Sequence, residues 1–414
     1  MLSLTNDGLV TYRHVGGLLG TTLVPDLATA LPPPTNGGRT YVFKLREGIR
    51  YSNGQLVEPE DFRRALERVY RLPAVTKYHR LARSFIGEFY GGIVGADQCR
   101  RNAARCDLSR GIVADRSHTV TFHLTARDPD FLYKLAFAMA DAVPRATPDR
   151  DTGRTPLPAT GPYMTQSFVP GRVWKLVRNR RFHAWSPDAQ PDGYPDRIVL
   201  RAYKSPSAAV TAIERGRADF LLCDTGDLRC PPPEQLKELA TRYPKQLRSD
   251  PQGATYSLVM NTRVPPFDHV TVRRALNYAV DRGRVVADAG GPIIAQPTCQ
   301  ILPPTFAGYR PYCPYTIDPG SAGVWTAPDL AKAEQLVARS GTRRMKVTVL
   351  TDSTEPTGEG RALCGLATRP ARLSRLVQGR TVGRSRPSAR LEHTLPDRVV
   401  HLAPGLPVSV QLRE

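Results

Sequence analysis

Apolar and polar positions along residues 256–282 predict a buried strand, a rigid turn and an amphipathic helix. Residues 258–260, Leu-Val-Met, end a short apolar run typical of a strand buried on both faces. Pro265 and Pro266 forbid both strand and helix, so they fix the direction in which the chain leaves. Asp268 is the expected N-cap of the helix that follows. The helix should bury Val272, Ala275, Leu276, Ala279 and Val280 and leave Arg273, Arg274 and Arg282 in water.

The first part of the chain predicts hairpins and a capped helix. Alternation over residues 41–45 indicates a half-buried strand, and Pro59 then opens a helix. Hairpins are expected over residues 111–124 and 160–177, with a short helix after Asp128 between them. The expected buried stripe of the helix from Pro59 is Phe62, Ala65, Leu66, Val69 and Tyr70.

The middle of the chain predicts a strand at 198–202, a helix at 208–213 and a buried strand at 220–222. This order of strand, helix and strand favours an α/β lobe with a largely parallel sheet. Ligands of such folds bind at the carboxyl ends of the strands. A further helix over 326–340 and a strand over 345–349 are expected.

Length, composition and cysteines narrow the class of protein. A chain of 414 residues should divide into two or three domains, and 41% hydrophobic with 23% charged residues is typical of a globular chain. No apolar run approaches the roughly 20 residues that a membrane helix requires. Six cysteines form close couples in polar loops, which favours local disulfides and an oxidising compartment over free thiols or a metal site. The couples are Cys99 with Cys106, Cys223 with Cys230, and Cys299 with Cys313.

The formal net charge of +20 raises the question whether the chain binds nucleic acid. The charge is spread along polar helix faces, and no aromatic and basic residues interleave as in a base-stacking platform. We therefore interpret it as a solvated surface and expect no nucleic-acid partner. His118 and His123 flank one expected strand, and we interpret them as sheet-surface residues, with no metal or other cofactor.

Four blocks of the chain, in order, resemble the solute-binding proteins of ABC transporters, family 5, which carry oligopeptides, dipeptides and nickel. They are residues 41–71 with YVFKLREGIRYSNGQLVEPEDFRRALERVYR, 160–179 with TGPYMTQSFVPGRVWKLVRN, 207–219, and 256–282 with YSLVMNTRVPPFDHVTVRRALNYAVDR. The resemblance implies an α/β fold of the periplasmic-binding-protein type, class II with an extra domain, in which two lobes close about a hinge. It implies capture and release of a solute without catalysis, and no catalytic motif such as G-x-S-x-G or H-E-x-x-H occurs in the sequence.

The resemblance also implies a division into domains and a set of partners. We expect a discontinuous lobe I at 1–27 and 160–252, an α+β domain II at 28–159, and a partial lobe III at 253–359. The expected function is that of an extracytoplasmic, cell-envelope-associated receptor, a monomer that delivers an oligopeptide or other small solute to an ABC permease. The alternative is a ligand-sensing domain once fused to a transcriptional regulator or kinase.

Candidate ligand contacts are residues in turns expected at lobe crossings. Asn261 and Thr262 end the strand before Pro265 and can bond to their own backbone. Clustered tyrosines on a proline-rich loop offer a large contact area at small entropic loss. The full set is Tyr163, Asn261, Thr262, Tyr309 and Tyr312. Each of them has packing within its own loop as the alternative role.

Both ends of the sequence depart from the family pattern. The start, MLSLTNDGLV, shows no recognisable secretion signal, which conflicts with life outside the membrane. After about residue 359 the resemblance stops, and residues 361–414 are arginine-rich without Lys, Phe, Tyr or Trp or lasting periodicity. A shifted reading frame or truncated gene, a basic, poorly ordered tail at 360–414, and a diverged ending are the three interpretations. On the first, the third lobe is incomplete and solute binding by these 414 residues is weak or absent.

Overall fold

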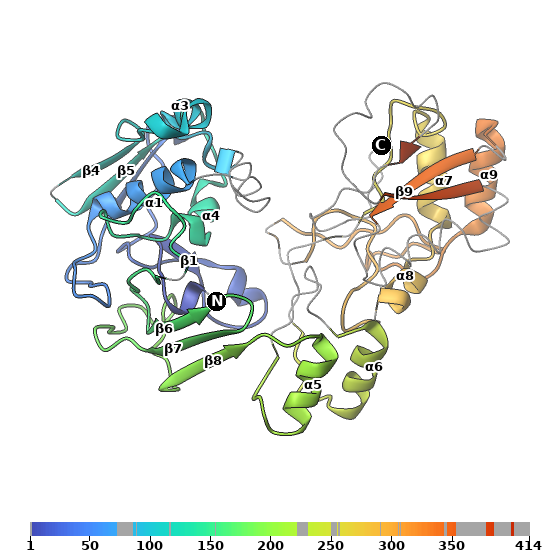
Figure 1. Ribbon diagram of the computed structural model, residues 1–414. Coiled ribbons are helices and arrows are strands. Elements are labelled where there is room, and N and C mark those ends of the chain that lie inside the picture. The colour runs from blue at the N-terminus through green and yellow to red at the C-terminus, as the bar shows by residue number, and fades with distance from the viewer. Residues whose placement is uncertain are drawn as a thin grey trace. The chain divides into compact units, whose positions relative to one another are not determined.

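The computed structural model describes two units of the chain, Met1–Ala202 and Tyr203–Glu414 (Figure 1). Each unit is considered separately below. The described residues are 2–72, 86–87, 89–115, 117–153, 155–221, 231–249, 255, 257–289, 291–304, 306 and 308–342, and the strands at 346–352, 378–384 and 399–400. The division into three lobes predicted from the sequence is finer than these two units and stays a prediction.

Unit 1 contains three small antiparallel sheets with the orders β1–β2, β3–β5–β4 and β6–β7–β8. Its strands are β1 Val10–Tyr12, β2 Leu23–Pro25, β3 Thr40–Lys44, β4 Ile112–Asp115, β5 Thr119–His123, β6 Tyr163–Val169, β7 Val173–Arg178 and β8 Arg197–Arg201. Its helices are η1 Leu2–Leu4, η2 Leu18–Thr21, η3 Asn36–Gly38, α1 Pro59–Arg71, α3 Ala96–Arg101, η4 Ala103–Arg105, α4 Phe131–Leu135 and η5 Ala138–Ala140.

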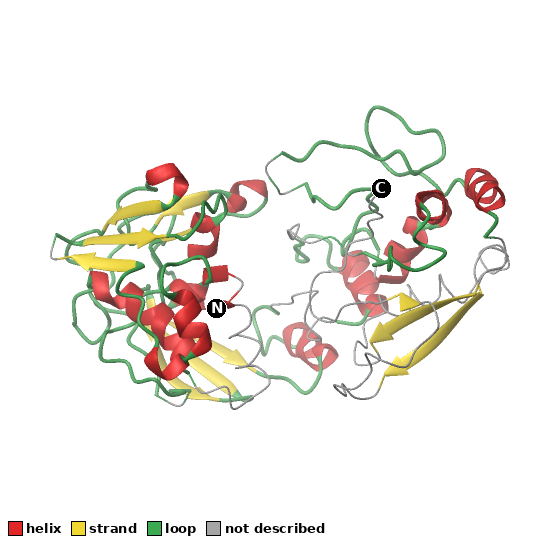
Figure 2. Ribbon diagram, turned by 90° about the horizontal axis from the view of Figure 1, so that it is seen from above, coloured by secondary structure: helices red, strands yellow, loops and turns green. Residues whose placement is uncertain are grey.

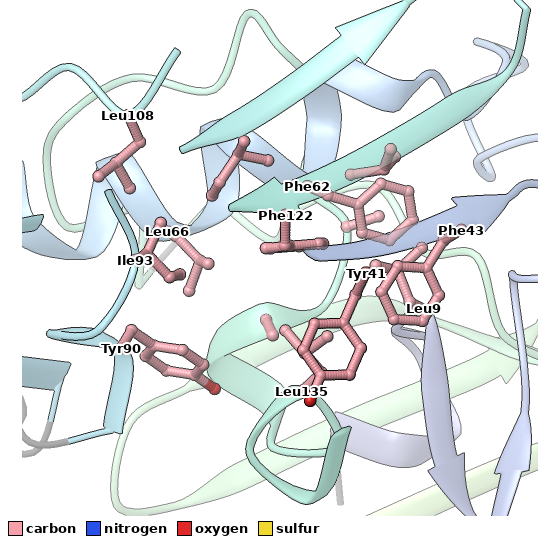
Figure 3. Close-up of a cluster of buried hydrophobic side chains, with 14 of the residues drawn as sticks. Leu9, Tyr41, Phe43, Phe62, Leu66, Tyr90, Ile93, Leu108, Phe122 and Leu135 are labelled. Carbon is pink, nitrogen blue, oxygen red and sulfur yellow. The ribbon is translucent and has the colours of Figure 1, made fainter. Parts of the chain in front are cut away.

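The core of unit 1 lies where α1 packs against β4 and β5 (Figures 1 and 3). The ring of Phe122 on β5 stands edge-on to the rings of Phe43 and Phe131, at 5.8 and 5.3 Å between centroids. Burying each such ring stabilises the fold by about 1.5 to 3 kcal/mol. The stripe of α1 is confirmed, since Phe62, Ala65, Leu66 and Tyr70 are buried and Val69 is partly buried. The hairpin over 111–124 is confirmed as β4 and β5.

The sheet β6–β7–β8 differs from the largely parallel sheet that was predicted. The expected hairpin over 160–177 is confirmed, but β8 joins β7 in antiparallel order, so the sheet expected to be largely parallel is antiparallel. The parallel pair was expected between the strands at 198–202 and 220–222; the crossover helix is present at Pro206–Glu214, but β8 pairs with its hairpin neighbour β7. The predicted strand at 220–222 also fails in its described part, because Phe220 is 64% exposed and lies in no strand.

Unit 2 has five described helices and one parallel sheet in the order β10–β9–β11. Figure 2 shows β9 and β10 side by side. The elements are α5 Pro206–Glu214, α6 Pro233–Arg242, α7 Val270–Ala279, α8 Arg282–Ala289, α9 Leu330–Ser340, β9 Lys346–Asp352, β10 Gln378–Arg384 and β11 Val399–Val400. Two of these strands lie in the region where no regular element was expected, because pairing to β9 through the backbone needs no apolar alternation.

Helices α7 and α9 pack together through Ala275, Leu336 and Val337 (Figure 1). The stripe predicted for α7 is largely buried, but the helix begins at Val270 after His269, so Asp268 is not its N-cap. The carboxylate of Asp268 instead accepts from the backbone N–H of His269, at 3.1 Å. Helix α9 begins at Leu330, four residues after the predicted start: Asp329 caps it by accepting from the N–H of Lys332 at 2.8 Å, and Gly341 ends it with a φ of 68°.

The strand predicted at 258–260 is absent, and Val259 is exposed. Three consecutive apolar residues do not form a strand without a partner strand, and none of the described strands pairs with this segment. No described helix is both long enough and apolar enough to span a bilayer.

Candidate functional site

A cavity of about 60 Å³ lies inside unit 1. It is bordered by the N-terminal segment, by the residue after β2, by the turn between α4 and η5, and by Gln190. Three carboxyl groups, those of Asp7, Asp26 and Asp141, line it together with His14. The remaining lining residues are Ser3, Asn6, Gly8, Val10, Thr11, Ala136 and Ala138.

Asp7 joins the N-terminal segment to the block at 160–190. Its Oδ2 accepts from the hydroxyl of Thr160 at 2.5 Å, and its Oδ1 accepts from the side-chain amide of Gln190. The same amide donates to the carbonyl of Ser3 at 2.9 Å. Gly161 in the TGPY block must be glycine, because a Cβ there would lie 2.9 Å from the carbonyl oxygen of Leu4. Burial raises the pKa of Asp7 to about 6, against the opposing effect of its two hydrogen bonds.

Asp26 and Asp141 complete the carboxyl cluster. Asp26 accepts from the indole N–H of Trp185 at 2.9 Å, and its carbonyl accepts from Arg46 at 2.8 Å. Burial, and then the neighbouring Asp7, raise the pKa of Asp26 well above its usual range. Burial followed by Asp7 also raises the pKa of Asp141, to about 8. Three carboxyl groups on the wall of one cavity, two of them buried, favour retention of a proton near neutral pH.

The three carboxyl groups and His14 do not form a metal-ligand set among the described residues. Within the described parts of the chain, no three His, Cys, Asp or Glu side chains converge as metal ligands. His14, on the cavity wall, has its pKa lowered by burial, which disfavours its cationic form. The arrangement therefore ties the N-terminal segment of unit 1 to the block at 160–190 through Asp7. This link could not be predicted from the sequence, since Asn6-Asp7-Gly8 has the composition of an exposed turn.

Tyr163 is the one predicted ligand contact in unit 1. Its side chain is 2% exposed and its hydroxyl donates to the carbonyl of Pro195 at 2.8 Å. The ring packs at the start of β6, opposite Arg178. The structure gives this tyrosine a packing position, which was the alternative role considered for it, because a phenol buries its ring well when its hydroxyl has a partner. Its contact with a solute stays a prediction.

The other four predicted contacts lie in unit 2, in two separate turns. Asn261 Oδ1 accepts from the N–H of Arg263 at 3.1 Å, which is the local bond expected of it, and Thr262 is exposed. Tyr309 is half-buried, while Tyr312 is 62% exposed. No hydrogen bond within the described ranges joins the first pair to the second. Their role in binding stays a prediction.

The loop that carries Tyr309 and Tyr312, which we call the tyrosine loop, is closed by a disulfide between Cys299 and Cys313. Inside it, the side-chain amide of Gln300 donates to the carbonyl of Arg310 at 2.8 Å. The second predicted disulfide, Cys99–Cys106, is also present, in the core of unit 1. The third predicted couple, Cys223 and Cys230, lies outside the described residues.

The side chain of Arg282 holds one end of the tyrosine loop. The prediction that this side chain lies in water is wrong. It is 4% exposed, and burial lowers its pKa to about 10. Its Nε donates to the carbonyl of Thr298 at 2.8 Å, next to the disulfide, and its Nη2 donates to the side chain of Asn277 at 3.0 Å. Arg273, also expected in water, is buried and donates to the carbonyl of Phe267 at 2.8 Å. Both guanidinium groups thus satisfy backbone oxygens at loop ends.

The chain is similar to known solute-binding proteins. Residues 22–363 match the family model described as bacterial extracellular solute-binding proteins, family 5 Middle. The periplasmic oligopeptide-binding protein OppA of Salmonella typhimurium is 26% identical over 253 residues, 60% of this chain and 43% of OppA. The glutathione-binding protein GsiB of Salmonella paratyphi A is 25% identical over 295 residues, 70% of this chain and 49% of GsiB. This chain thus spans less than half the length of either relative.

Solved structures agree on the fold. A clavulanic acid biosynthesis oligopeptide binding protein 2 aligns with a TM-score of 0.69 at 24% identity, over 92% of this chain and 66% of that one. The periplasmic murein tripeptide binding protein MppA, in an unliganded open form, aligns with a TM-score of 0.68 at 21% identity, over 92% and 68%. The fold is therefore that of the periplasmic binding proteins, as the sequence predicted. Matched over most of its length by the family model, this chain is a member of the bacterial extracellular solute-binding proteins, family 5, a family of binding proteins and not of enzymes.

Proposed function

We propose that this chain is the solute receptor of an ABC import system, that its solute is an oligopeptide, and that it works outside the cytoplasm with a membrane permease. The observation that carries the proposal is the family match over residues 22–363. A relative described as periplasmic and oligopeptide-binding supports both the location and the class of solute. A monomer is the form we expect to bind, since capture between lobes needs no second copy.

The tyrosine loop of unit 2 supports the peptide as solute. Its exposed residues Ile301, Phe306 and Tyr312 offer apolar and aromatic surface, and the Cys299–Cys313 disulfide restricts the loop before any ligand arrives. A restricted aromatic loop loses little conformational entropy on binding an extended peptide. Asn261 and Thr262 present polar groups on a separate turn of the same unit, suited to the peptide backbone.

Native mass spectrometry of the purified chain tests the proposal directly, because a retained peptide adds a discrete mass. Titration calorimetry with a library of tripeptides to pentapeptides then measures affinity, including the weak binding expected if the third lobe is incomplete. Within the class of peptides that bind, Tyr312→Ala should weaken binding about 10-fold. Tyr194→Ala is the matched control, because Tyr194 is 96% exposed and lies in unit 1.

The two variants separate the parts of the proposal. If the native chain binds peptides and both variants lose the same affinity, the tyrosine loop does not contact the peptide. The proposal that the chain is a solute receptor would still stand. A chain that binds no peptide by either method, up to millimolar concentration, would refute oligopeptide binding by these residues.

A further inference from the structure

The solvent side of the sheet β6–β7–β8 carries a regular set of cationic and apolar side chains. Side chains alternate between the faces of a sheet, and the register of the three strands fixes which residues share a face. The inward face is marked by Tyr163 and Leu176, which are buried. The rows of the opposite face, from β6 to β8, are Met164, Val177 and Arg197, then Ser167, Lys175 and Val199, then Val169, Val173 and Arg201. We call these nine residues the outer face.

The outer face is positively charged and holds no carboxylate. Lys175, Arg197 and Arg201 are its three cations, and none of them has an ion-pair or hydrogen-bond partner among the described residues. Arg197 and Arg201 lie on the same strand about 13 Å apart along it, and Lys175 lies between them on the neighbouring strand. The cations therefore form a triangle over the sheet, free to meet phosphate groups.

Apolar side chains fill the positions between the cations. Val199 lies directly opposite Lys175, and Val173 lies directly opposite Arg201, at neighbour distance across the strands. Val169 and Val199 are exposed to solvent. Long cationic side chains can reach outward to a charged layer while shorter apolar side chains contact the layer beneath it.

We propose that the outer face binds the surface of a membrane rich in anionic phospholipid. Cations near such a surface are attracted by its negative potential, and this chain carries a net charge of +20. The binding is peripheral and reversible, since it uses only side chains on the surface of one sheet. It is separate from solute capture and does not rest on it.

Other partners fit the outer face less well. Protein interfaces are enriched in aromatic anchors and depleted in lysine at their centre, and the outer face has a central lysine and no aromatic residue. Single-stranded nucleic acid needs aromatic rings for base stacking, and Phe168 and Trp174 belong to the opposite face. A second copy of this chain would bring like charges together.

The test is co-sedimentation of the full chain with vesicles. Vesicles of phosphatidylglycerol and phosphatidylcholine in equal parts should bind the chain, and vesicles of phosphatidylcholine alone should not. Each cation at the surface strengthens binding about fivefold, so the triple variant Lys175→Gln, Arg197→Gln, Arg201→Gln should bind on the order of 100-fold more weakly. Rising salt should release the native chain from the vesicles.

A matched triple variant separates this face from the effect of bulk charge. Arg101→Gln, Arg105→Gln, Arg110→Gln removes three exposed arginines of unit 1 that belong to no strand of this sheet, for the same change in net charge. It should keep most of the binding. Equal loss in both triple variants, binding to neutral vesicles, or no binding to anionic vesicles would each overturn the proposal. Circular dichroism of both triple variants checks that they are folded, so that lost binding is not caused by unfolding.

Discussion

The carboxyl cluster of unit 1 makes the stability of that unit depend on pH. Asp141 has a pKa of about 8 in the folded chain against an ordinary value of 3.8, so folding raises its affinity for a proton. A group whose folded pKa is raised stabilises the fold below its unfolded pKa, and this contribution is lost as the pH rises through the folded pKa. The pH range over which Asp141 lowers the stability of unit 1 with rising pH therefore ends near pH 8.

The magnitude follows from the number of protons involved. Each pH unit in the window lowers the free energy of unfolding by up to about 1.4 kcal/mol for one proton. Asp7 has a pKa of about 6 and is mostly ionised above about pH 6.5, and His14, whose pKa is lowered by burial, is neutral there. Between about pH 6.5 and pH 8, unit 1 should lose about 2 kcal/mol through Asp141.

The perturbation is Asp141→Asn, which replaces the carboxyl by a neutral group of similar shape. Between about pH 6.5 and pH 8 the variant should lose about 2 kcal/mol less stability than the native chain, because the proton of Asp141 no longer contributes to the pH dependence. Urea titrations monitored by hydrogen exchange and mass spectrometry would report on β5 for unit 1 and on α9 for unit 2. Unit 2 lacks the cluster and serves as an internal control.

A second control is Asp196→Asn, because Asp196 is exposed and lies just before β8. This variant should keep the native pH dependence. The reasoning fails if the native unit 1 is equally stable at both ends of the window, or if Asp141→Asn loses stability with pH as steeply as the native chain does.

Two further predictions concern unit 2. The double variant Cys299→Ser, Cys313→Ser opens the tyrosine loop and should lower the unfolding free energy of unit 2 by about 3 kcal/mol, with unit 1 unchanged in the same exchange experiment; an equal loss in both units would contradict a local role. Arg282→Met leaves the Thr298 carbonyl and the Asn277 side chain without a donor and should lower the stability of unit 2 by about 2 to 4 kcal/mol in urea titrations. Arg282→Lys should recover part of this loss, and full stability of Arg282→Met would show that the buried guanidinium does not hold the loop.

The sequence alone determined the elements whose side-chain period matches their burial. The stripe from Phe62 to Tyr70 and the hairpin of β4 and β5 follow from spacings of 3.6 and 2, because each periodicity places apolar residues on one face. The same local patterns, in four ordered blocks, were enough to indicate the family. The spacing of Cys99 with Cys106 and of Cys299 with Cys313 indicated their disulfides.

Tertiary structure decided what depends on which segments meet. Asp7, Asp26 and Asp141 come from distant parts of the chain, so their shared cavity and raised pKa values could not be predicted from any one of them. Arg282 has the sequence context of a solvated residue and is buried because a loop closes over it. A sequence pattern records which side of its own element a residue occupies, whereas burial and charge are set by the neighbours that folding brings to that side.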